Sequence, residues 1–183
     1  MLPVFTIGHS NRPFEDFAAI LKDARVEQVA DVRTVPRSRA NPQYNADALP
    51  NELAGSGIEY ERFTELGGLR GRSHEVPPEV NGFWQNTSFH NYADYAMSDS
   101  FAAGLDRLTA VAEKKSTAIM CAEAVWWRCH RRIIADYLIA RGRTVLHLMG
   151  NGRIEPAQLT FAAENRGGIL LYPEEKTVDQ ANR

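Results

Sequence analysis

The chain has 183 residues, of which 44% are hydrophobic and 24% are charged, with a formal net charge of −2. A chain of this length can bury a sizeable core without disulfides or a structural metal, so its composition predicts an ordinary globular domain and excludes disordered and fibrous proteins. The near-neutral charge and a pI near 6.2 exclude a protein that is basic over its whole surface. Any preference for anions must therefore be local.

The two ends of the chain predict neither an export signal nor a membrane segment. Residues 1–5 lead directly into an apolar run and do not have the basic region and small-residue cleavage site of a secretory leader. No apolar run approaches the length of a membrane span. We therefore expect a cytoplasmic protein with reduced cysteines and no membrane partner. We expect one domain over residues 1–172 and a C-terminal tail over residues 173–183.

Strand and helix signals alternate from the start of the chain. Residues 4–8 are apolar and β-branched and predict a short strand. Asn11 is a candidate cap for the helix that follows, which has Pro13 near its first turn. Residues 26–32, "VEQVADV", predict a second strand that ends next to Arg33.

The middle of the chain is less regular. A stretch interrupted by three prolines precedes residues 57–63, "GIEYERF", which predict a third strand. Residues 64–88 contain four glycines and two prolines with almost no periodicity, which indicates a loop or lid. Apolar residues then recur at helical spacing over residues 92–115, with an expected break at residues 98–100.

The last part of the chain returns to alternation. Residues 117–121, "TAIMC", predict a buried strand, residues 130–142 a helix closing on Gly142, and residues 144–149 another buried strand. Strand, helix, strand repeated along the chain predicts an α/β fold. We expect a three-layer sandwich with a mostly parallel sheet in a single domain.

Polar side chains follow several of the predicted strands. His9 and Ser10 follow the first strand, Arg33 ends the second, and Cys121 and Glu123 end the "TAIMC" strand. Ligands of parallel sheets bind beyond the carboxyl ends of the strands, so these residues are expected on one rim, with the loop of residues 64–88 near them. The alternative is that strand ends are simply where polar residues occur.

Residues 121–132, "CAEAVWWRCHRR", hold both cysteines of the chain and two of its three tryptophans. Cys129 lies where a loop enters a helix and is followed by His130, which favours a thiolate, whereas Cys121 ends an apolar strand that raises a thiol pKa. Glu123 can act as a general base or anchor an arginine. Both thiols can instead be structural. The candidate catalytic residues are Cys129, Cys121, His9, His130 and Glu123.

Arginines gather in the predicted strand-end loops of this slightly acidic chain. Guanidinium groups pair with phosphate or carboxylate in a fork geometry, so the site is expected to receive an anion. The alternative is a set of solvated arginines in surface ion pairs. The two adjacent tryptophans either offer a stacking surface or pack into the protein. The candidate substrate-binding residues are Ser10, Arg33, Arg37, Arg131, Arg132, Trp126 and Trp127.

Five separated motifs carry a family resemblance. "TIGHS", "DVRTVPRS", "ELGG", "CAE" and "CHRR", in this order, resemble the family catalogued as domain of unknown function 488, and residues 121–132 resemble one of its common subgroups. The resemblance extends from about Phe5 to Met149. It implies a small bacterial α/β protein whose polar motifs form a common site, and it implies no established reaction.

These observations favour a cytosolic thiol-dependent enzyme that acts on an anionic small molecule, with nucleotide-like compounds among the candidates. The alternative is a binding module, either for nucleic acid through the arginines or for haem or metal through the cysteines and histidines. Two cysteines and five histidines show no paired zinc spacing, so no metal site is predicted. The sequence does not specify a cofactor or an oligomeric state.

Overall fold

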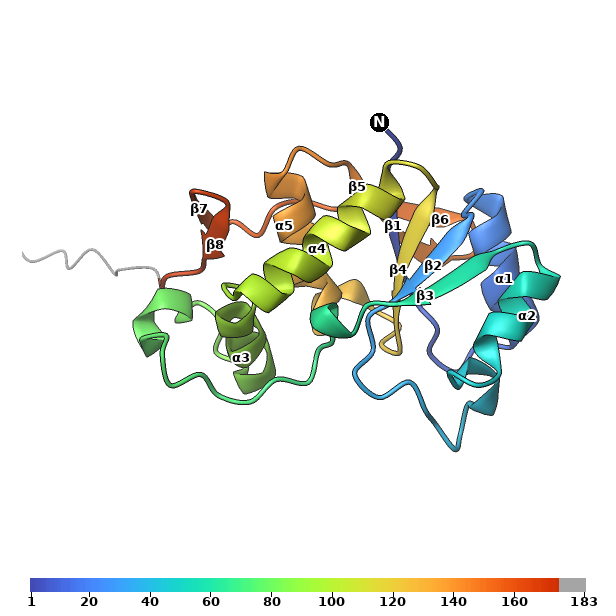
Figure 1. Cartoon of the computed structure of the whole chain (residues 1–183), viewed down its shortest axis with the longest axis horizontal. Coiled ribbons are helices and arrows are strands. Elements are labelled where there is room, and N and C mark those ends of the chain that lie inside the picture. Colours follow the sequence, from blue (N-terminus) through green and yellow to red (C-terminus); the bar gives the residue numbers. More distant parts are fainter. Residues whose placement is uncertain (175–183) are drawn as a thin grey trace, which may run out of the picture.

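The structure, a computed structural model, describes residues 1–174 and is organised around one six-stranded sheet (Figure 1). Its strand order is β3-β2-β4-β1-β5-β6. Five strands are parallel, and β6 pairs antiparallel with β5 at one edge. The strands are β1 (Val4–Gly8), β2 (Gln28–Asp31), β3 (Glu59–Arg62), β4 (Thr117–Cys121), β5 (Val145–Gly150) and β6 (Arg153–Pro156). A separate hairpin is formed by β7 (Glu164–Arg166) and β8 (Ile169–Leu171).

Helices cover both faces of the sheet. They are α1 (Phe14–Asp23), α2 (Leu49–Gly55), α3 (Thr87–Tyr95), α4 (Asp99–Ala112) and α5 (Arg131–Ala140). In Figure 1, α1 and α2 lie on one side of the central strands, and α4 and α5 lie on the other. Each side has its own cluster of buried apolar residues, one with Phe17 and Leu53 and the other with Leu105 and Ile134. The predicted three-layer α/β sandwich in a single domain is confirmed.

The central strands β1 and β4 are mostly apolar because both of their faces are covered. Every residue of β1 and of β4 is buried. These two strands pair in register, with Gly8 opposite Cys121 at their carboxyl ends. The loops after both strands therefore leave the sheet side by side.

Two local predictions in the first third of the chain were wrong. Pro13 occupies the position before α1, and no side chain caps this helix, so Asn11 is not its cap. The proline-rich stretch contains the helix α2, with Pro50 in its first turn, where a missing N–H costs nothing. Leu49 and Leu53 hold this short helix against the sheet because both are fully buried.

The middle of the chain is closer to prediction. Residues 64–88 are mostly irregular, with single 3-10 turns at Thr64–Leu66 and Pro78–Asn81. The predicted break in the helical region is correct, since the Ser98 side chain caps α4. The preceding helix begins earlier than expected because Asn86 caps it at Thr87.

The C-terminal part contains elements that were not predicted, namely β6 and the hairpin of β7 and β8. Residues 175–183, which make up most of the predicted tail, lie outside the described residues. Within residues 1–174, no helix has both the length and the apolar character that crossing a membrane requires.

Candidate functional site

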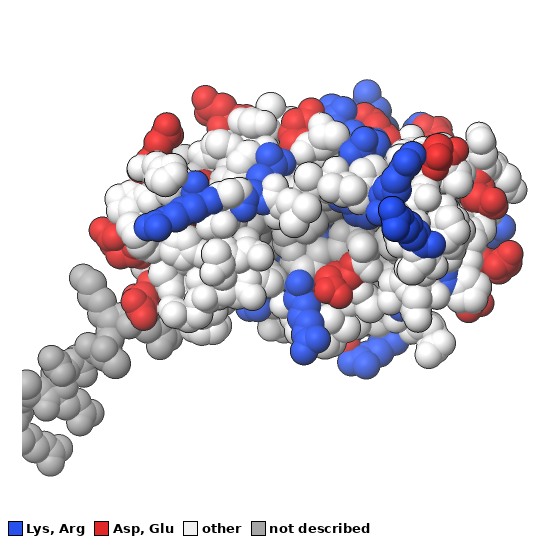
Figure 2. Space-filling view, turned by 90° about the horizontal axis from the view of Figure 1, so that it is seen from below, with Lys and Arg blue, Asp and Glu red and all other residues white. Residues whose placement is uncertain are grey.

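The carboxyl ends of the parallel strands bring the predicted polar residues to one edge. The His9 backbone N–H donates to the Cys121 carbonyl at 2.9 Å, and Nη1 of Arg33 lies 3.2 Å from Nε2 of His9. The predicted convergence of His9, Arg33 and Cys121 is therefore confirmed. Figure 2 looks at this edge from below the view of Figure 1. Several Lys and Arg side chains lie on this face, one acidic side chain lies near its middle, and most of the other acidic side chains lie toward the margins.

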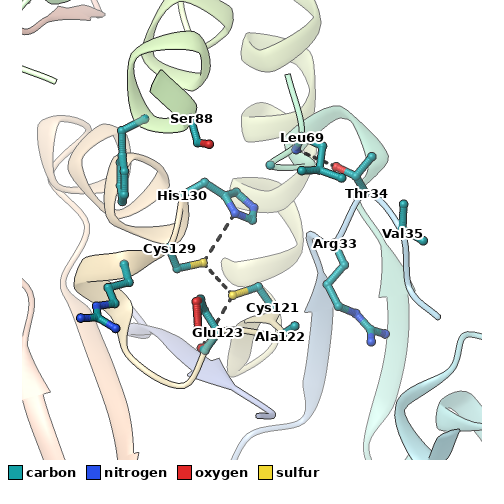
Figure 3. A pocket seen from close by; sticks show the side chains of 13 residues that line it. Arg33, Thr34, Val35, Leu69, Ser88, Cys121, Ala122, Glu123, Cys129 and His130 are labelled. Carbon is teal, nitrogen blue, oxygen red and sulfur yellow. Dashed lines mark hydrogen bonds between the residues drawn. The ribbon is translucent and has the colours of Figure 1, made fainter. Parts of the chain in front are cut away.

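A cavity of about 280 Å³ opens at this edge and reaches both cysteines. The loop of residues 64–88 contributes to its wall, as predicted. Three exposed or half-buried apolar side chains, Val35, Leu69 and Phe89, form part of its lining. The lining residues are Arg33, Thr34, Val35, Gly68, Leu69, Ser88, Phe89, Cys121, Ala122, Glu123, Arg128, Cys129 and His130. Figure 3 shows the thiols and His130 facing one another, while the Arg33 side chain points away from them.

The two cysteines lie in direct contact. Their Sγ atoms are 2.6 Å apart, and both thiols are free. Cys121 is the last residue of β4, and Cys129 lies two residues before α5. The two residues are only 3% and 4% exposed. Both residues line the cavity, so their side chains lie at its wall and not on the open surface.

Several donors converge on the Cys129 sulfur. Arg131 donates to Sγ from Nε at 3.3 Å and from its backbone N–H at 3.5 Å, and Nδ1 of His130 lies 3.5 Å away. Burial alone would raise the pKa of the Cys129 thiol. The hydrogen bond from Cys121 and the positive charges of His130 and Arg131 outweigh burial and hold this pKa well below the ordinary cysteine value. These contacts favour the thiolate form of Cys129.

Cys121 has a different environment. Apart from Cys129, its sulfur lies 3.9 Å from the Glu123 carbonyl oxygen, and the charge of Arg131 is close enough to lower its pKa. Burial, followed by the neighbouring Cys129 thiolate, raises the pKa of the Cys121 thiol well above its ordinary value. The two environments therefore favour the charged form of Cys129 and the protonated form of Cys121.

His130 is oriented by a backbone carbonyl. Its Nε2 lies 3.0 Å from the Val32 carbonyl oxygen, so Nε2 carries the hydrogen and donates it to that oxygen. The proton that moves is then the one on Nδ1, which faces the thiol of Cys129. A Cβ on Gly68 would lie 2.4 Å from Nδ1, so the close fit of this ring requires glycine at position 68. A thiol, an imidazole beside it and a carbonyl that orients the ring thus lie in one row.

Arg131 faces the sulfur and not the solvent. Its residue is 1% exposed, and its Nη2 donates to the Glu123 carbonyl at 2.6 Å. Nη1 lies 3.5 Å from the Thr6 hydroxyl, which is 2.7 Å from Nδ1 of His147. Glu123 therefore anchors an arginine through its backbone oxygen. A Cβ on Gly8 would lie 1.8 Å from the same oxygen, which explains the glycine at the end of β1.

Arg33 is held in a buried ion pair. Its Nε and Nη2 donate to both Asp31 carboxylate oxygens at 2.6–3.1 Å, and Tyr60 donates to the same carboxylate at 2.6 Å. Arg33 and Asp31 are 6% and 0% exposed. His9 donates from Nδ1 to the Ser10 carbonyl, and its Nε2 accepts from Arg33. Burial, with the nearby arginine charges, lowers the pKa of His9 to about 4, so this ring is neutral at pH 7.

A second, more polar cavity adjoins the first. It has a volume of about 290 Å³ and shares Arg33, Val35 and Ala122 with the thiol cavity. Its other lining residues are His9, Ser10, Asn11, Arg37, Ser38 and Asn41. Hydroxyl, amide and guanidinium donors of this kind suit an anionic or polar group. Ser10 and Arg37, two of the predicted substrate-binding residues, lie here.

Arg132 and the tryptophans occupy a different region. Trp126 stacks on His147 with ring centroids 4.5 Å apart, and its Nε1 donates to Glu155 at 3.1 Å. Arg132 donates to Thr160 at 3.2 Å, and Trp127 is exposed. Neither tryptophan nor Arg132 lines the thiol cavity or the polar cavity. The two tryptophan rings are nearly perpendicular, at 89°, as expected for adjacent residues that point different ways.

Several residues of the site were not predicted. The Val32 carbonyl orients His130, and the Asp31 carboxylate orients Arg33. Gly8 and Gly68 leave room for the Glu123 carbonyl and the His130 ring, respectively. All four belong to motifs of the sequence, the glycines to "TIGHS" and "ELGG" and the other two to "DVRTVPRS", but the motifs do not show which groups these residues contact. Within residues 1–174, no group of three or more His, Cys, Asp or Glu side chains is arranged to hold a metal ion.

The fold and the site together define an α/β sandwich that carries a buried thiol pair at the carboxyl edge of a parallel sheet. The family described as Domain of unknown function DUF488 matches residues 13–138, which is more than half of the chain, and the protein belongs to this family. The matched range includes the "DVRTVPRS", "ELGG", "CAE" and "CHRR" motifs, whereas "TIGHS" precedes it. Searches of curated proteins and of solved structures found no match.

Proposed function

We propose that this protein is a thiol-dependent enzyme in which the Cys129 thiolate attacks an electrophilic atom of an anionic small molecule. The observation that carries the proposal is the convergence of the Arg131 N–H donors, His130 and the Cys121 thiol on one sulfur at the end of a cavity. A structural thiol needs no such donors. A nucleophile does, because the thiolate is the reactive form and neighbouring positive charge maintains it at neutral pH.

His130 has the role of acid and base in this proposal. Its Nδ1 takes the proton of Cys129 and returns it to the leaving group, while the Val32 carbonyl keeps the ring in place. His9 is a less suitable base, since its ring nitrogens bond to the Ser10 carbonyl and to Arg33 and not to a thiol. Glu123 contacts Arg131 and Cys121 through its carbonyl oxygen, and we assign it a positioning role.

The substrate is proposed to span both cavities. Its reactive end and an apolar body fit the thiol cavity beside Val35, Leu69 and Phe89. Its anionic group fits the polar cavity near Ser10 and Arg37, or the mouth near Arg128. Arg128 lines the thiol cavity, is exposed, and has no ion-pair partner within residues 1–174. The charge of Arg33, by contrast, is largely offset by Asp31.

A pair of alkylating reagents tests both parts of the proposal. The Cys121→Ser protein, in which Cys129 is the remaining thiol, is treated with neutral iodoacetamide and with anionic iodoacetate at low salt and pH 7. An ordinary thiolate reacts faster with the neutral reagent. We expect the local cations to raise the rate with iodoacetate relative to iodoacetamide, because they concentrate an anion at the thiol. The rates are measured by mass spectrometry of the alkylated peptide.

Matched variants identify the cations. Arg128→Gln is expected to reduce the preference for iodoacetate, whereas Arg166→Gln, in β7 and paired with Glu164, is expected to leave it unchanged. A Cys129 that reacts with neither reagent until the protein is unfolded would disprove the nucleophile. A Cys129 that reacts readily but shows the reagent preference of an ordinary thiol would disprove the anionic substrate and retain the nucleophile.

A further inference from the structure

The thiol pair itself carries an inference that deepens the proposed function. A cysteine that attacks an acyl, phosphoryl or alkyl group needs one sulfur and one base, which Cys129 and His130 already provide. Here a second sulfur lies 2.6 Å from the first, and both residues line the same cavity. A thiol in this position is within bonding reach of any intermediate formed on Cys129.

The two sulfurs differ in the way that thiol–disulfide exchange requires. Cys129 is surrounded by Arg131 and His130 and is the attacking group. Cys121 lies near the Glu123 carbonyl oxygen, and the Arg131 N–H groups donate to the sulfur of Cys129. An exchange reaction needs an accessible thiolate for the first attack and a nearby second thiol that remains protonated until it resolves the mixed disulfide. The surroundings of the two sulfurs therefore favour attack by Cys129 first and resolution by Cys121 second.

Little movement is needed to join the sulfurs. The two residues are eight positions apart, and the loop between them is held at both ends. The Cys121 carbonyl accepts from the His9 N–H at 2.9 Å, and the Cys129 N–H donates to the Trp126 carbonyl at 3.1 Å. A disulfide requires close Cβ atoms and sulfurs that approach without backbone rearrangement, and a pair already in contact meets the second requirement.

We propose that Cys129 and Cys121 reduce a sulfur–sulfur bond of an anionic small molecule and end as an intramolecular disulfide. The proposal rests on the proposed function, because it takes Cys129 as the nucleophile and the cavity as the substrate site. The substrate class is a low-molecular-weight disulfide, R–S–S–R′, with a carboxylate or similar anionic group and an apolar body. Val35, Leu69 and Phe89 suit the body, and Arg128 suits the charge.

The reaction balances in two exchanges. The Cys129 thiolate attacks one substrate sulfur, forms the mixed disulfide Cys129–S–S–R, and releases R′–S⁻, which is protonated to R′–SH. Cys121 then loses its proton through His130 or the departing thiolate, attacks Sγ of Cys129, and releases the second thiol, R–SH. Two electrons pass from the protein thiols to the substrate. A dithiol reductant returns the protein disulfide to two thiols and is itself oxidised to a disulfide.

An anionic aromatic disulfide, dithiobis(nitrobenzoate), is a suitable probe because each half that leaves absorbs visible light. The reduced wild-type protein is mixed with an equimolar amount of the probe. We expect two coloured thiolates per protein, no adduct by intact-mass measurement, a mass lower by two hydrogens, and a tryptic link between the Cys121 and Cys129 peptides. Dithiothreitol is expected to restore both thiols and the starting mass.

Single-cysteine variants separate the two proposals. Cys121→Ser and Cys121→Ala are expected to release one coloured thiolate and to keep the other half of the probe on Cys129. Two variants are used so that a loss of fold in one, checked by circular dichroism, does not decide the result. Cys129→Ser is expected to react far more slowly than either, because the remaining thiol keeps its proton.

Two outcomes would overturn the inference. A wild-type protein that releases one coloured thiolate and retains a stable adduct on Cys129 would show that Cys121 does not resolve it, although the Cys129 nucleophile would stand. A wild-type protein in which Cys121 takes the adduct first would reverse the assigned order. A Cys129 inert both to this probe and to iodoacetamide would instead remove the proposed function itself.

Discussion

Nδ1 of His130 lies 3.5 Å from Sγ of Cys129, while Nε2 of the same ring lies 3.0 Å from the Val32 carbonyl oxygen. The ring thus joins the loop after β2 to the thiol that precedes α5. Since the carbonyl can only accept, the hydrogen on Nε2 is held, and the exchangeable proton belongs to Nδ1. This relationship makes the thiolate of Cys129 sensitive to changes at His130.

The first prediction concerns the pH dependence of alkylation. In Cys121→Ser, the rate of Cys129 alkylation by iodoacetamide is expected to reach half its maximum well below the free-cysteine pKa of about 8.5, because adjacent cations favour the thiolate. In Cys129→Ser, the lone Cys121 is expected to reach half its maximum above that value, because burial disfavours its charged form. Equal midpoints for the two thiols would contradict the assignment. Adding His130→Gln to Cys121→Ser is expected to move the Cys129 midpoint upward.

The second prediction uses a glycine to displace His130. Gly68→Ala places a Cβ only 2.4 Å from Nδ1 of His130, so the ring must move away from Cys129 or from the Val32 carbonyl. Alkylation of Cys129 at pH 6–7 is expected to slow while the circular dichroism spectrum is retained. Gly71→Ala, in the same loop with no atom within 4 Å of the added Cβ, is the matched control and should react like the parent. Equal rates of Cys129 alkylation in the two variants would show that His130 does not activate this thiol.

The third prediction separates two arginines that were both candidate anion ligands. Asp31→Asn leaves the buried Arg33 without its carboxylate and is expected to lower the free energy of unfolding by about 3–5 kcal/mol. Asp47→Asn removes the partner of Arg37 from an exposed pair with a 3.7 Å separation, and is expected to change stability by about 0–1 kcal/mol. Urea unfolding at pH 7 measures both. Similar small effects would mean that Arg33 is available to bind a ligand.

The fourth prediction concerns stability at acidic pH. Burial, followed by nearby positive charge, lowers the pKa of His147 from 6.5 to about 4. Because the folded pKa lies below the unfolded one, this neutral ring contributes its full stability above pH 6.5, and the contribution is lost as the pH falls toward 4. At pH 5 the loss is on the order of 2 kcal/mol for such a shift.

The pH dependence is assigned by comparing variants. His147→Gln is expected to flatten the fall in the free energy of unfolding between pH 7 and pH 5. His74→Gln, at an exposed position, is expected to follow the wild type. His9, whose pKa is also lowered to about 4, is expected to contribute a dependence of the same sign. A His147→Gln protein with the slope of the wild type would show that this ring is not held neutral by the fold.

Much of the architecture follows from local patterns. The "TAIMC" strand matches β4 residue for residue, and the expected break before α4 falls at its Ser98 cap. Periodicity and capping depend on residues close together in the chain, so they can be recognised from the sequence alone. The helix α2 was missed because its short helical signal is weak, and burial of Leu49 and Leu53 stabilises it.

The sequence predicted the edge of the sheet at which the site lies, but it did not predict the contacts among the site's side chains. Parallel strands end at one edge, so the convergence of His9, Arg33 and Cys121 followed from the order of the elements. The sequence also distinguished Cys129 from Cys121 correctly in the direction of their pKa shifts. Both inferences depend on short-range features, a strand end and a helix start.

Tertiary structure alone decided which groups each arginine and each thiol meets. Arg33 turns to Asp31 and Arg131 turns to Cys129, although the sequence presents both as cations at the same edge. The orienting carbonyl of Val32 is 98 positions away from His130. Fork-shaped guanidinium groups bind whichever acceptor burial leaves beside them, and that choice depends on contacts between distant segments. The sequence by itself determined the edge at which the chemistry gathers, and packing determined that its two sulfurs touch.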